Sequence, residues 1–279
     1  MPDRTYEGVL LACDLDGTLL DARGVLHPEN LDALHGFLAA GGRFAVATGR
    51  SQASVVRNLP QLPSDLPGIF CNGAHLYDRA TRTTVRAHPL PGSAGALIDD
   101  LKTRFPSVGL EIFTSFGAHL VRTCPVLRRQ LAAEDCQDAE LSPDEVPAPW
   151  LKLLIGGDPE ELVPVRAHLE ACCGADWSIV KSDAHLLDLM ARGVSKGSAL
   201  RELKALLEAE RGGRRFRTVA VGDNENDLDM LRAADLAIVP ENGTHGVRSH
   251  AHHVVAHHAE PVLPAVLRIV RDDLGKIGK

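Results

Sequence analysis

The segment from Val9 to Leu20, VLLACDLDGTLL, decides the architecture expected for this chain. Its first five residues are apolar without a break, which is typical of a parallel strand that is buried on both faces. Asp14 and Asp16 follow at once, two apart on an extended segment, so their side chains point the same way, and Gly17 allows a sharp turn. Ligands of open α/β sheets gather at the carboxyl ends of strands, and paired carboxylates repel unless a cation or a shared proton relieves them. The segment therefore predicts a site that holds a cation or a shared proton at the end of a core strand, in preference to a solvated DxDG turn of a calcium loop or a plain loop.

The rest of the chain alternates short apolar runs with amphipathic segments, which indicates an α/β fold with a parallel sheet. Between about residues 90 and 185 the pattern changes, and hairpin signals at residues 115–117 and 182–183 favour an antiparallel sheet. We therefore expect a parallel-sheet core of residues 1–88 and 188–279, interrupted by an inserted α+β domain of residues 89–187. Further buried strands of the core are predicted at residues 44–47, 68–71, 216–221 and 236–239.

Two short motifs offer groups that suit an anion. Thr48, Gly49 and Arg50 follow the second predicted strand, where Thr48 supplies a hydroxyl donor and Gly49 lets backbone amides approach an anion. Lys196 follows Ser195, a suitable helix N-cap, and a lysine at this place faces the positive end of the helix dipole. A bound anion would offset that repulsion. Read alone, the first motif also fits an ordinary turn and the second an ordinary surface lysine.

An acidic cluster, GDNEND at residues 222–227, follows the predicted strand at 216–221. Asp223 and Asp227 are four residues apart and share one face if a helix begins here. Helix capping accounts for one or two such carboxylates, but less well for so dense a cluster. Together with Asp14 and Asp16 these groups suit Mg²⁺, whereas a lysine and a hydroxyl suit phosphate.

In the order DxDGT, TGR, lysine and GDxxND, these motifs resemble those of the haloacid dehalogenase superfamily. The long insertion before the lysine, and Asn72-Gly73-Ala74 ahead of it, resemble the branch with a C2-type cap, the Cof-type or sucrose-phosphatase-like hydrolases of subfamily IIB. The resemblance covers the whole chain. It implies a Rossmann-like core with an inserted α+β cap, and a Mg²⁺-dependent phosphatase that hydrolyses a small phosphorylated metabolite, such as a sugar or polyol phosphate, through an aspartyl-phosphate intermediate.

The resemblance also implies a role for each motif residue. Asp14 would be the nucleophile, and Asp16 would protonate the leaving alcohol and then activate water. The metal ligands would be Asp14, Asp223 and the backbone carbonyl of Asp16. Phosphate binding would fall to Thr48, Gly49, Lys196 and Asn226, and Asp227 would orient a metal-bound water and pair with Lys196.

Substrate specificity is expected in the insertion, because the core motifs contact only the phosphoryl group and the metal. The turn at residues 181–185, KSDAH, lies between two predicted strands close to the return into the core. Lys181 and His185 in this turn are candidate substrate contacts, as is Arg50 in the core. The alternative for the turn is an exposed hairpin tip that binds no ligand.

Composition limits the partners. The formal net charge of −7 argues against a nucleic acid or an anionic membrane as partner, and no protein partner is predicted. No apolar run approaches the roughly 20 residues that span a bilayer, and the N-terminus lacks the features of a signal peptide, so we expect a cytoplasmic protein. The six cysteines contain no CxxC motif and are expected to be free thiols.

Two other functions stay open at this point. A phosphomutase of the same superfamily would share the chemistry up to the aspartyl phosphate. A catalytically idle binding or regulatory protein would keep the fold, although the presence of every motif residue argues against it.

Overall fold

The structure of the protein is a computed structural model that describes residues 4–63, 65–131 and 139–277. A five-stranded parallel sheet forms one lobe, in the order β13-β12-β11-β1-β2, and confirms the predicted α/β fold. The first predicted strand is β1, which lies between β11 and β2 in that order. The bounds are β1 (Val9–Cys13), β2 (Arg43–Val46), β11 (Arg217–Val221), β12 (Leu236–Pro240) and β13 (His253–Val255).

Helices cover both faces of this sheet. The odd-numbered residues of β1 pack in the apolar cluster that includes α1 (Pro28–Ala39) and α9 (Leu263–Ile277). The even-numbered residues pack with α6 (Lys196–Glu210) and α7 (Leu228–Ala233). Every residue of β1 is therefore buried, which explains its unbroken apolar sequence. Two shorter helices of this lobe are α2 (Gln52–Asn58) and α8 (His245–Arg248).

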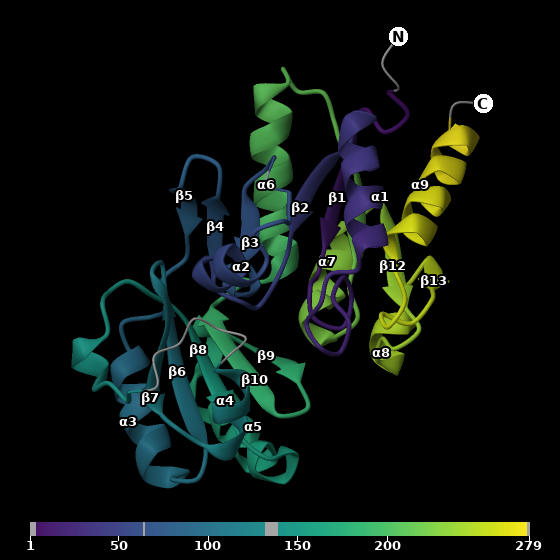
Figure 1. Cartoon of the computed structure of the whole chain (residues 1–279). Coiled ribbons are helices and arrows are strands. Elements are labelled where there is room, and N and C mark those ends of the chain that lie inside the picture. Colours follow the sequence, from purple (N-terminus) through teal and green to yellow (C-terminus); the bar gives the residue numbers. More distant parts are fainter. Residues whose placement is uncertain (1–3, 64, 132–138, 278–279) are drawn as a thin grey trace.

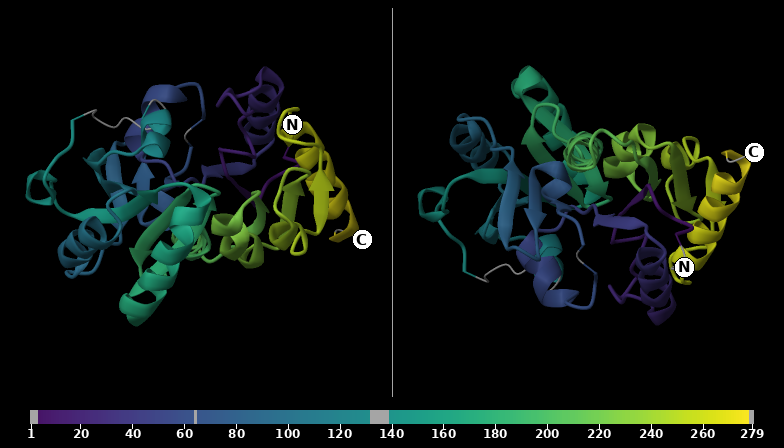
Figure 2. Two further views of the ribbon diagram at one scale, coloured as in Figure 1. Left: turned by 90° about the horizontal axis from the view of Figure 1, so that it is seen from below. Right: turned by 90° about the horizontal axis from the view of Figure 1, so that it is seen from above.

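A small antiparallel sheet continues the core beyond β2. It contains β3 (Gly68–Phe70), β4 (His75–Asp78) and β5 (Thr83–Ala87), and a parallel bridge between Ala47 and Ile69 joins it to the end of β2. The chain then enters the second lobe, which lies beside the core in Figure 1 and in both views of Figure 2.

A five-stranded antiparallel sheet, in the order β7-β6-β8-β10-β9, forms this second lobe, which we call the cap. The predicted change to antiparallel pairing at residues 115–117 and 182–183 is therefore confirmed. The division at residues 88/89 and 187/188 stays a prediction, and its second boundary falls inside β10, which runs to Ala191. The bounds are β6 (Gly109–Thr114), β7 (Gly117–Arg122), β8 (Trp150–Gly156), β9 (Trp177–Asp183), β10 (Leu186–Ala191), α3 (Ala94–Arg104), α4 (Pro125–Gln130) and α5 (Pro159–Cys172).

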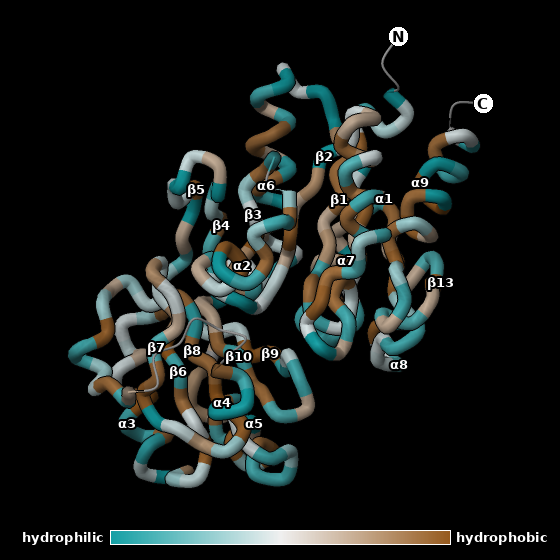
Figure 3. Tube along the Cα trace, in the orientation of Figure 1, coloured by the Kyte–Doolittle hydropathy of each residue, from teal (hydrophilic) through white to brown (hydrophobic). Residues whose placement is uncertain are grey.

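The two faces of the cap sheet have different neighbours. One face packs against α3 and α5 in an apolar cluster of its own. The other face, which carries Phe113, Leu154 and Leu186, belongs to the same apolar cluster as α1 and β1 of the core. Figure 3 shows hydrophobic segments running through both lobes, with hydrophilic segments on the outer turns. The cap thus turns one side of its sheet toward the core.

The described helices include none that is long and apolar enough to cross a membrane. Five of the six cysteines are described, at positions 13, 71, 124, 172 and 173, and all five are free thiols, as predicted. Cys136 lies outside the described residues.

Candidate active site

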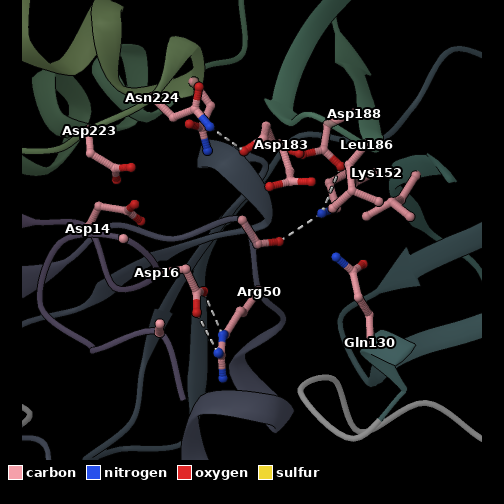
Figure 4. A pocket seen from close by; sticks show the side chains of 16 residues that line it. Asp14, Asp16, Arg50, Gln130, Lys152, Asp183, Leu186, Asp188, Asp223 and Asn224 are labelled. Carbon is pink, nitrogen blue, oxygen red and sulfur yellow. Dashed lines mark hydrogen bonds and ion pairs between the residues drawn. The ribbon is translucent and has the colours of Figure 1, made fainter. Parts of the chain in front are cut away.

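A cavity of about 460 Å³ lies between the core and the cap. Its core side consists of the loops that follow β1, β2 and β11, the strands whose carboxyl ends the sequence pointed to. Its cap side comes from α4, β8, β9 and β10, as Figure 4 shows. Among the predicted site residues, the cavity is lined by Asp14, Asp16, Gly49, Arg50, Asp223 and Asn226.

Asp14 lies at the floor of the cavity next to a buried lysine. The Nζ atom of Lys196 is 2.7 Å from Oδ1 of Asp14 and 2.7 Å from Oδ1 of Asp227. Lys196 and Asp227 are fully buried and do not line the cavity, and Asp14 is 5% exposed. Lys196 is the first residue of α6, and Ser195 caps this helix by accepting a hydrogen bond from the Ser198 amide. The two carboxylates therefore supply the negative charge that a lysine at a helix N-terminus requires.

The titration of this cluster reflects its burial. Burial raises the pKa of Asp14 well above its usual value, and the Asp227 carboxylate raises it further, whereas Lys196 opposes both. Burial lowers the pKa of Lys196, but the charges of Asp14 and Asp227 outweigh it and raise this pKa. Burial, followed by the charge of Asp227, raises the pKa of Asp223 to about 7. Burial is the largest cause of both raised carboxylate pKa values, and the neighbouring carboxylates raise them further against the opposing charge of Lys196.

The loop after β11 brings a third carboxylate to the floor. Oδ1 of Asp223 accepts a hydrogen bond of 2.8 Å from the Thr18 hydroxyl, in the loop after β1. The four-residue spacing predicted that Asp223 and Asp227 share one helix face. They do not, because the first helical turn begins only at Glu225. Instead, Oδ2 of Asp227 accepts hydrogen bonds from the backbone amides of Asp223 and Asn224 and fixes the loop.

Three carboxylates converge closely enough to hold a cation. Ligand oxygens of Asp14, Asp223 and Asp227 lie within 4.8 Å of one another. Gly17, with φ of +76°, is needed here because a Cβ at this position would lie 2.5 Å from Oδ2 of Asp223. Hard oxygen donors with uncompensated negative charge fit a Mg²⁺ ion. Both oxygens of Asp227 are engaged by Lys196 and the loop amides, so Asp14 and Asp223 are the members of this cluster that line the cavity.

Asp16 and Arg50 form a two-point ion pair at the rim of the cavity. Nε and Nη2 of Arg50 lie 2.8 Å and 2.6 Å from the two carboxylate oxygens of Asp16, as Figure 4 shows. The Asp16 side chain is 54% exposed, in contrast to the buried Asp14. Asp16 is therefore accessible from the cavity and oriented by a core residue.

The predicted phosphate-binding groups surround the same floor, although not all of them reach the cavity. Thr48 is buried, does not line the cavity, and its hydroxyl oxygen accepts a hydrogen bond from the Arg50 amide. Gly49 lines the cavity, and its carbonyl oxygen faces the cap. Asn226 also lines it, but its side-chain nitrogen donates to Oδ1 of Asn72 at 3.1 Å. Phosphate binding by Thr48, Gly49, Lys196 and Asn226 stays a prediction.

Lys152 of β8 and Asp188 of β10, which were not predicted from the sequence, form the most strongly buried polar pair of the cavity wall. Nζ of Lys152 is 3.1 Å from Oδ1 of Asp188, 2.8 Å from the carbonyl oxygen of Gly49 and 3.8 Å from the centre of the Phe113 ring. Oδ2 of Asp188 accepts a hydrogen bond of 2.7 Å from Asn72 of the core. A signal was available, because Lys152 and Asp188 are lone charges of opposite sign in the apolar strands WLKLLIG and LLDLMA.

The predicted substrate turn lies at the cavity, but the two residues singled out in it do not. Ser182 and Asp183 line the cavity, whereas Lys181 and His185 do not. The pairing of β9 with β10 is irregular here, so simple alternation along β9 fails to give the inward residues. His185 turns away to the carbonyl of Gly157 at 3.3 Å. Arg50, the third candidate contact, lines the cavity.

Known proteins match this chain over most of its length. The family model of the haloacid dehalogenase-like hydrolases matches residues 11–266. Pyridoxal phosphate phosphatase YbhA of Escherichia coli strain K12 is 29% identical over 258 residues, covering 88% of this chain and 92% of that protein. The 5-amino-6-(5-phospho-D-ribitylamino)uracil phosphatase YwtE of Bacillus subtilis strain 168 is 24% identical over 260 residues, covering 83% of this chain and 87% of that protein.

Solved structures share the whole architecture. A haloacid dehalogenase-like hydrolase from Bacteroides thetaiotaomicron has a TM-score of 0.78 at 21% sequence identity, covering 95% of this chain and 99% of that one. The family match extends from the middle of β1 into α9 and therefore includes all four motifs and the cap. The resemblance read from the motifs is confirmed: the chain belongs to the haloacid dehalogenase-like hydrolases.

Proposed function

We propose that this protein is a Mg²⁺-dependent phosphatase that hydrolyses small phosphorylated metabolites through an aspartyl phosphate formed on Asp14. One observation carries the proposal: Asp14 lies at the floor of a cavity between core and cap, beside Lys196 and Asp223, with Asp16 two residues further on. Phosphoryl transfer needs positioning and charge neutralisation above all, and this floor supplies both. Membership of the hydrolase family and its phosphatase relatives support the same reaction.

The proposed first step is attack of an Asp14 oxygen on phosphorus. Lys196 holds Oδ1 of Asp14, which leaves Oδ2 as the attacking atom and fixes the orientation of the carboxylate. Because Lys196 is buried and bound to two carboxylates, it does not need to move during the reaction. Its ammonium also offsets charge on the phosphoryl oxygens as the bond to phosphorus forms.

Asp16 serves as the acid and then the base. It stands on the same segment as Asp14 and is exposed to the cavity, where the leaving alcohol departs. It gives a proton to that alcohol and later takes one from the water that attacks the aspartyl phosphate. Arg50 holds Asp16 at two points in this structure, so the arriving substrate must compete with the guanidinium or share the carboxylate with it.

Magnesium would be held by Asp14, Asp223 and the backbone carbonyl of Asp16. When bound, the ion neutralises negative charge on the transferring phosphoryl group. The raised pKa values of Asp14 and Asp223 support a cation in this place, because burial and mutual repulsion leave these carboxylates short of positive charge.

The substrate is proposed to be a small phosphate monoester, of the size of a sugar, polyol or cofactor phosphate. A cavity of about 460 Å³ accommodates such a molecule, and the cap closes over it. Two relatives are named for pyridoxal phosphate and for a phosphorylated ribitylaminouracil, and both compounds belong in a substrate screen.

A screen of phosphate release tests the proposal. Purified protein is incubated with Mg²⁺ and a panel of sugar, nucleotide and cofactor phosphates that includes pyridoxal 5′-phosphate, and inorganic phosphate is measured. We expect Mg²⁺-dependent release from p-nitrophenyl phosphate and from a subset of the panel. Isomerised phosphate esters in place of free phosphate would identify a phosphomutase. No turnover of any ester by folded protein would contradict the proposal and favour an idle binding protein.

A further inference from the structure

The wall of the cavity contains buried oxygen atoms that lack a hydrogen-bond partner. Within the described residues these are Oγ of Ser182, Oδ1 of Asp188 and Oδ1 of Asn226. Oδ1 of Asp188 is 3.1 Å from Lys152 Nζ, an ion-pair contact without hydrogen-bond geometry, and the Asp188 side chain is 1% exposed. Leaving buried polar atoms unpaired is costly in free energy, so a ligand that supplies donors to these atoms would be favoured.

The orientation of these atoms follows from one carboxylate. Asp188 can only accept hydrogen bonds, so Asn72 must turn its NH₂ group toward Oδ2 of Asp188. The Asn72 carbonyl oxygen then accepts from the NH₂ group of Asn226. Asn226, which lines the cavity, is left with its buried carbonyl oxygen as an acceptor without a partner. The cap residue Asp188 thus sets acceptors on both sides of the cavity.

The positive charges of the wall are already engaged. Arg50 is bound at two points by Asp16. Lys152 is paired with Asp188, donates a hydrogen bond to the Gly49 carbonyl and lies over the face of the Phe113 ring, so its charge is already held within the wall. The described cap side of the cavity therefore presents two carboxylates, Asp183 and Asp188, against the one ammonium of Lys152.

We propose that the cap side of this cavity selects phosphate esters whose alcohol part donates hydrogen bonds and carries no second anionic group. Hydroxyl or protonated amino groups of the leaving alcohol would meet the open oxygens of Asp188 and Asn226, with Asp183 close by. A carboxylate or second phosphate would face the excess negative charge without a cation to receive it. The inference rests on the proposed phosphatase function, since it concerns the alcohol bound in that same site.

Matched substrates test the inference. kcat/KM is measured with Mg²⁺ for glucose 6-phosphate, for glucosamine 6-phosphate, which has an amine, and for 6-phosphogluconate, which has a carboxylate. Each ester is also tested as a competitive inhibitor of p-nitrophenyl phosphate hydrolysis, so that binding is ranked even where turnover is slow. We expect 6-phosphogluconate to be about tenfold or more poorer than glucose 6-phosphate in kcat/KM and in inhibition, because like charges meet in a buried site.

The outcomes distinguish the proposed phosphatase function from the proposed substrate selectivity. If neither p-nitrophenyl phosphate nor any of the sugar phosphates is hydrolysed, the proposed function fails. If it is hydrolysed and 6-phosphogluconate performs within about threefold of glucose 6-phosphate, the selectivity is overturned while the function stands. A higher kcat/KM for glucosamine 6-phosphate than for glucose 6-phosphate supports a cationic hydrogen-bond donor, and an equal kcat/KM supports a neutral donor. A kcat/KM for glucosamine 6-phosphate that is tenfold lower than that for glucose 6-phosphate contradicts a wall rich in hydrogen-bond acceptors.

A charge variant links the effect to the cap. Asp183→Asn removes one negative charge from the wall without removing a partner of buried Lys152. We expect it to raise the ratio of kcat/KM for 6-phosphogluconate to that for glucose 6-phosphate by about tenfold. Asp158→Asn is the matched control, because Asp158 lies outside the cavity and asparagine caps α5 as well as aspartate does, so this ratio should not change. An unchanged ratio in Asp183→Asn would exclude Asp183 from the subsite.

Discussion

Lys152 of the cap donates a hydrogen bond of 2.8 Å to the carbonyl oxygen of Gly49, in the core loop proposed to bind phosphate. The same ammonium pairs with Asp188, which accepts a hydrogen bond from Asn72 of the core. Both members of the pair are at most 2% exposed. The cap is therefore joined to the core loops by hydrogen bonds from the two members of a buried ion pair, one to Gly49 and one from Asn72.

Breaking this pair should destabilise the fold. Lys152→Met leaves the Asp188 carboxylate buried without its counter-charge and should lower the free energy of unfolding by about 3–5 kcal/mol. Lys152→Met combined with Asp188→Asn should cost less than the sum of the two single changes, because neither charge is then left alone. Chemical denaturation measures all three variants. Lys181→Met, on β9 and outside the cavity, is the control and should stay within about 0.5 kcal/mol of the parent. Strict additivity would show that the pair is not coupled.

Asp16→Asn should separate substrates by their leaving groups. General acid–base help is worth about a hundred- to ten-thousand-fold, and a poor leaving group needs more of it. In the phosphoryl-transfer step a sugar phosphate should therefore lose more than p-nitrophenyl phosphate does. Single-turnover kinetics isolates this step from the later attack by water. Equal losses for both esters would count against Asp16 as the acid.

The acidic floor predicts dependence on a divalent metal. EDTA should abolish activity and Mg²⁺ should restore it, whereas Ca²⁺ should substitute poorly because it accepts more ligands and longer bonds than Mg²⁺ does. Phosphate release in each buffer is the measurement, and full activity in chelator would exclude the metal.

The pH dependence of metal binding has a defined sign. Asp223 has a pKa of about 7 in the metal-free site, raised by burial and by Asp227, and must lose its proton to bind the ion. Below pH 7 the apparent Mg²⁺ affinity should therefore fall, by about tenfold per pH unit for one competing proton. Calorimetric titration at pH 6 and pH 8 measures this, and equal affinities would contradict the assignment of Asp223.

His75 makes stability depend on pH in another part of the core. Its side chain is fully buried beside Thr84, and burial lowers its pKa from 6.5 to about 4. The unfolded chain then takes up the proton first, so the stability is complete above pH 6.5 and is lost as the pH falls toward 4. Between pH 7 and pH 5 the loss should be about 2 kcal/mol. Urea unfolding should show a shallower pH dependence in His75→Gln, and identical slopes would exclude His75 as the source.

Much of the core could be predicted from sequence because its signals are local. β1 is apolar without a break because helices cover both faces of the sheet, and the acids that follow it stand at the strand end where the cavity lies. The positive charge of Lys196 at the start of α6 is repelled by the helix dipole, so the sequence predicted a nearby anion. Asp14 and Asp227 supply that negative charge. These inferences needed only the strand period, the helix dipole and the order of motifs.

The long-range contacts of the site and the register of its cap strands could not be derived in the same way. The pairing of Arg50 with Asp16 joins residues 34 apart, and Asn72 meets Asp188 across 116 residues, so only the folded chain brings them together. In the turn at residues 181–185, the irregular register between β9 and β10 places Ser182 and Asp183 at the cavity in place of Lys181 and His185. Such register shifts leave no mark in the hydrophobic pattern.

Steady-state phosphate release by Asp14→Asn decides whether Asp14 is the nucleophile. The amide cannot attack phosphorus as the carboxylate does, and it also loses the charge that faces Lys196 and the metal. The measurement compares pure parent and variant proteins on p-nitrophenyl phosphate with Mg²⁺, after circular dichroism has shown that both are folded. We expect turnover in the parent and none above background in the folded variant. Near-normal turnover by folded Asp14→Asn would contradict this role of Asp14.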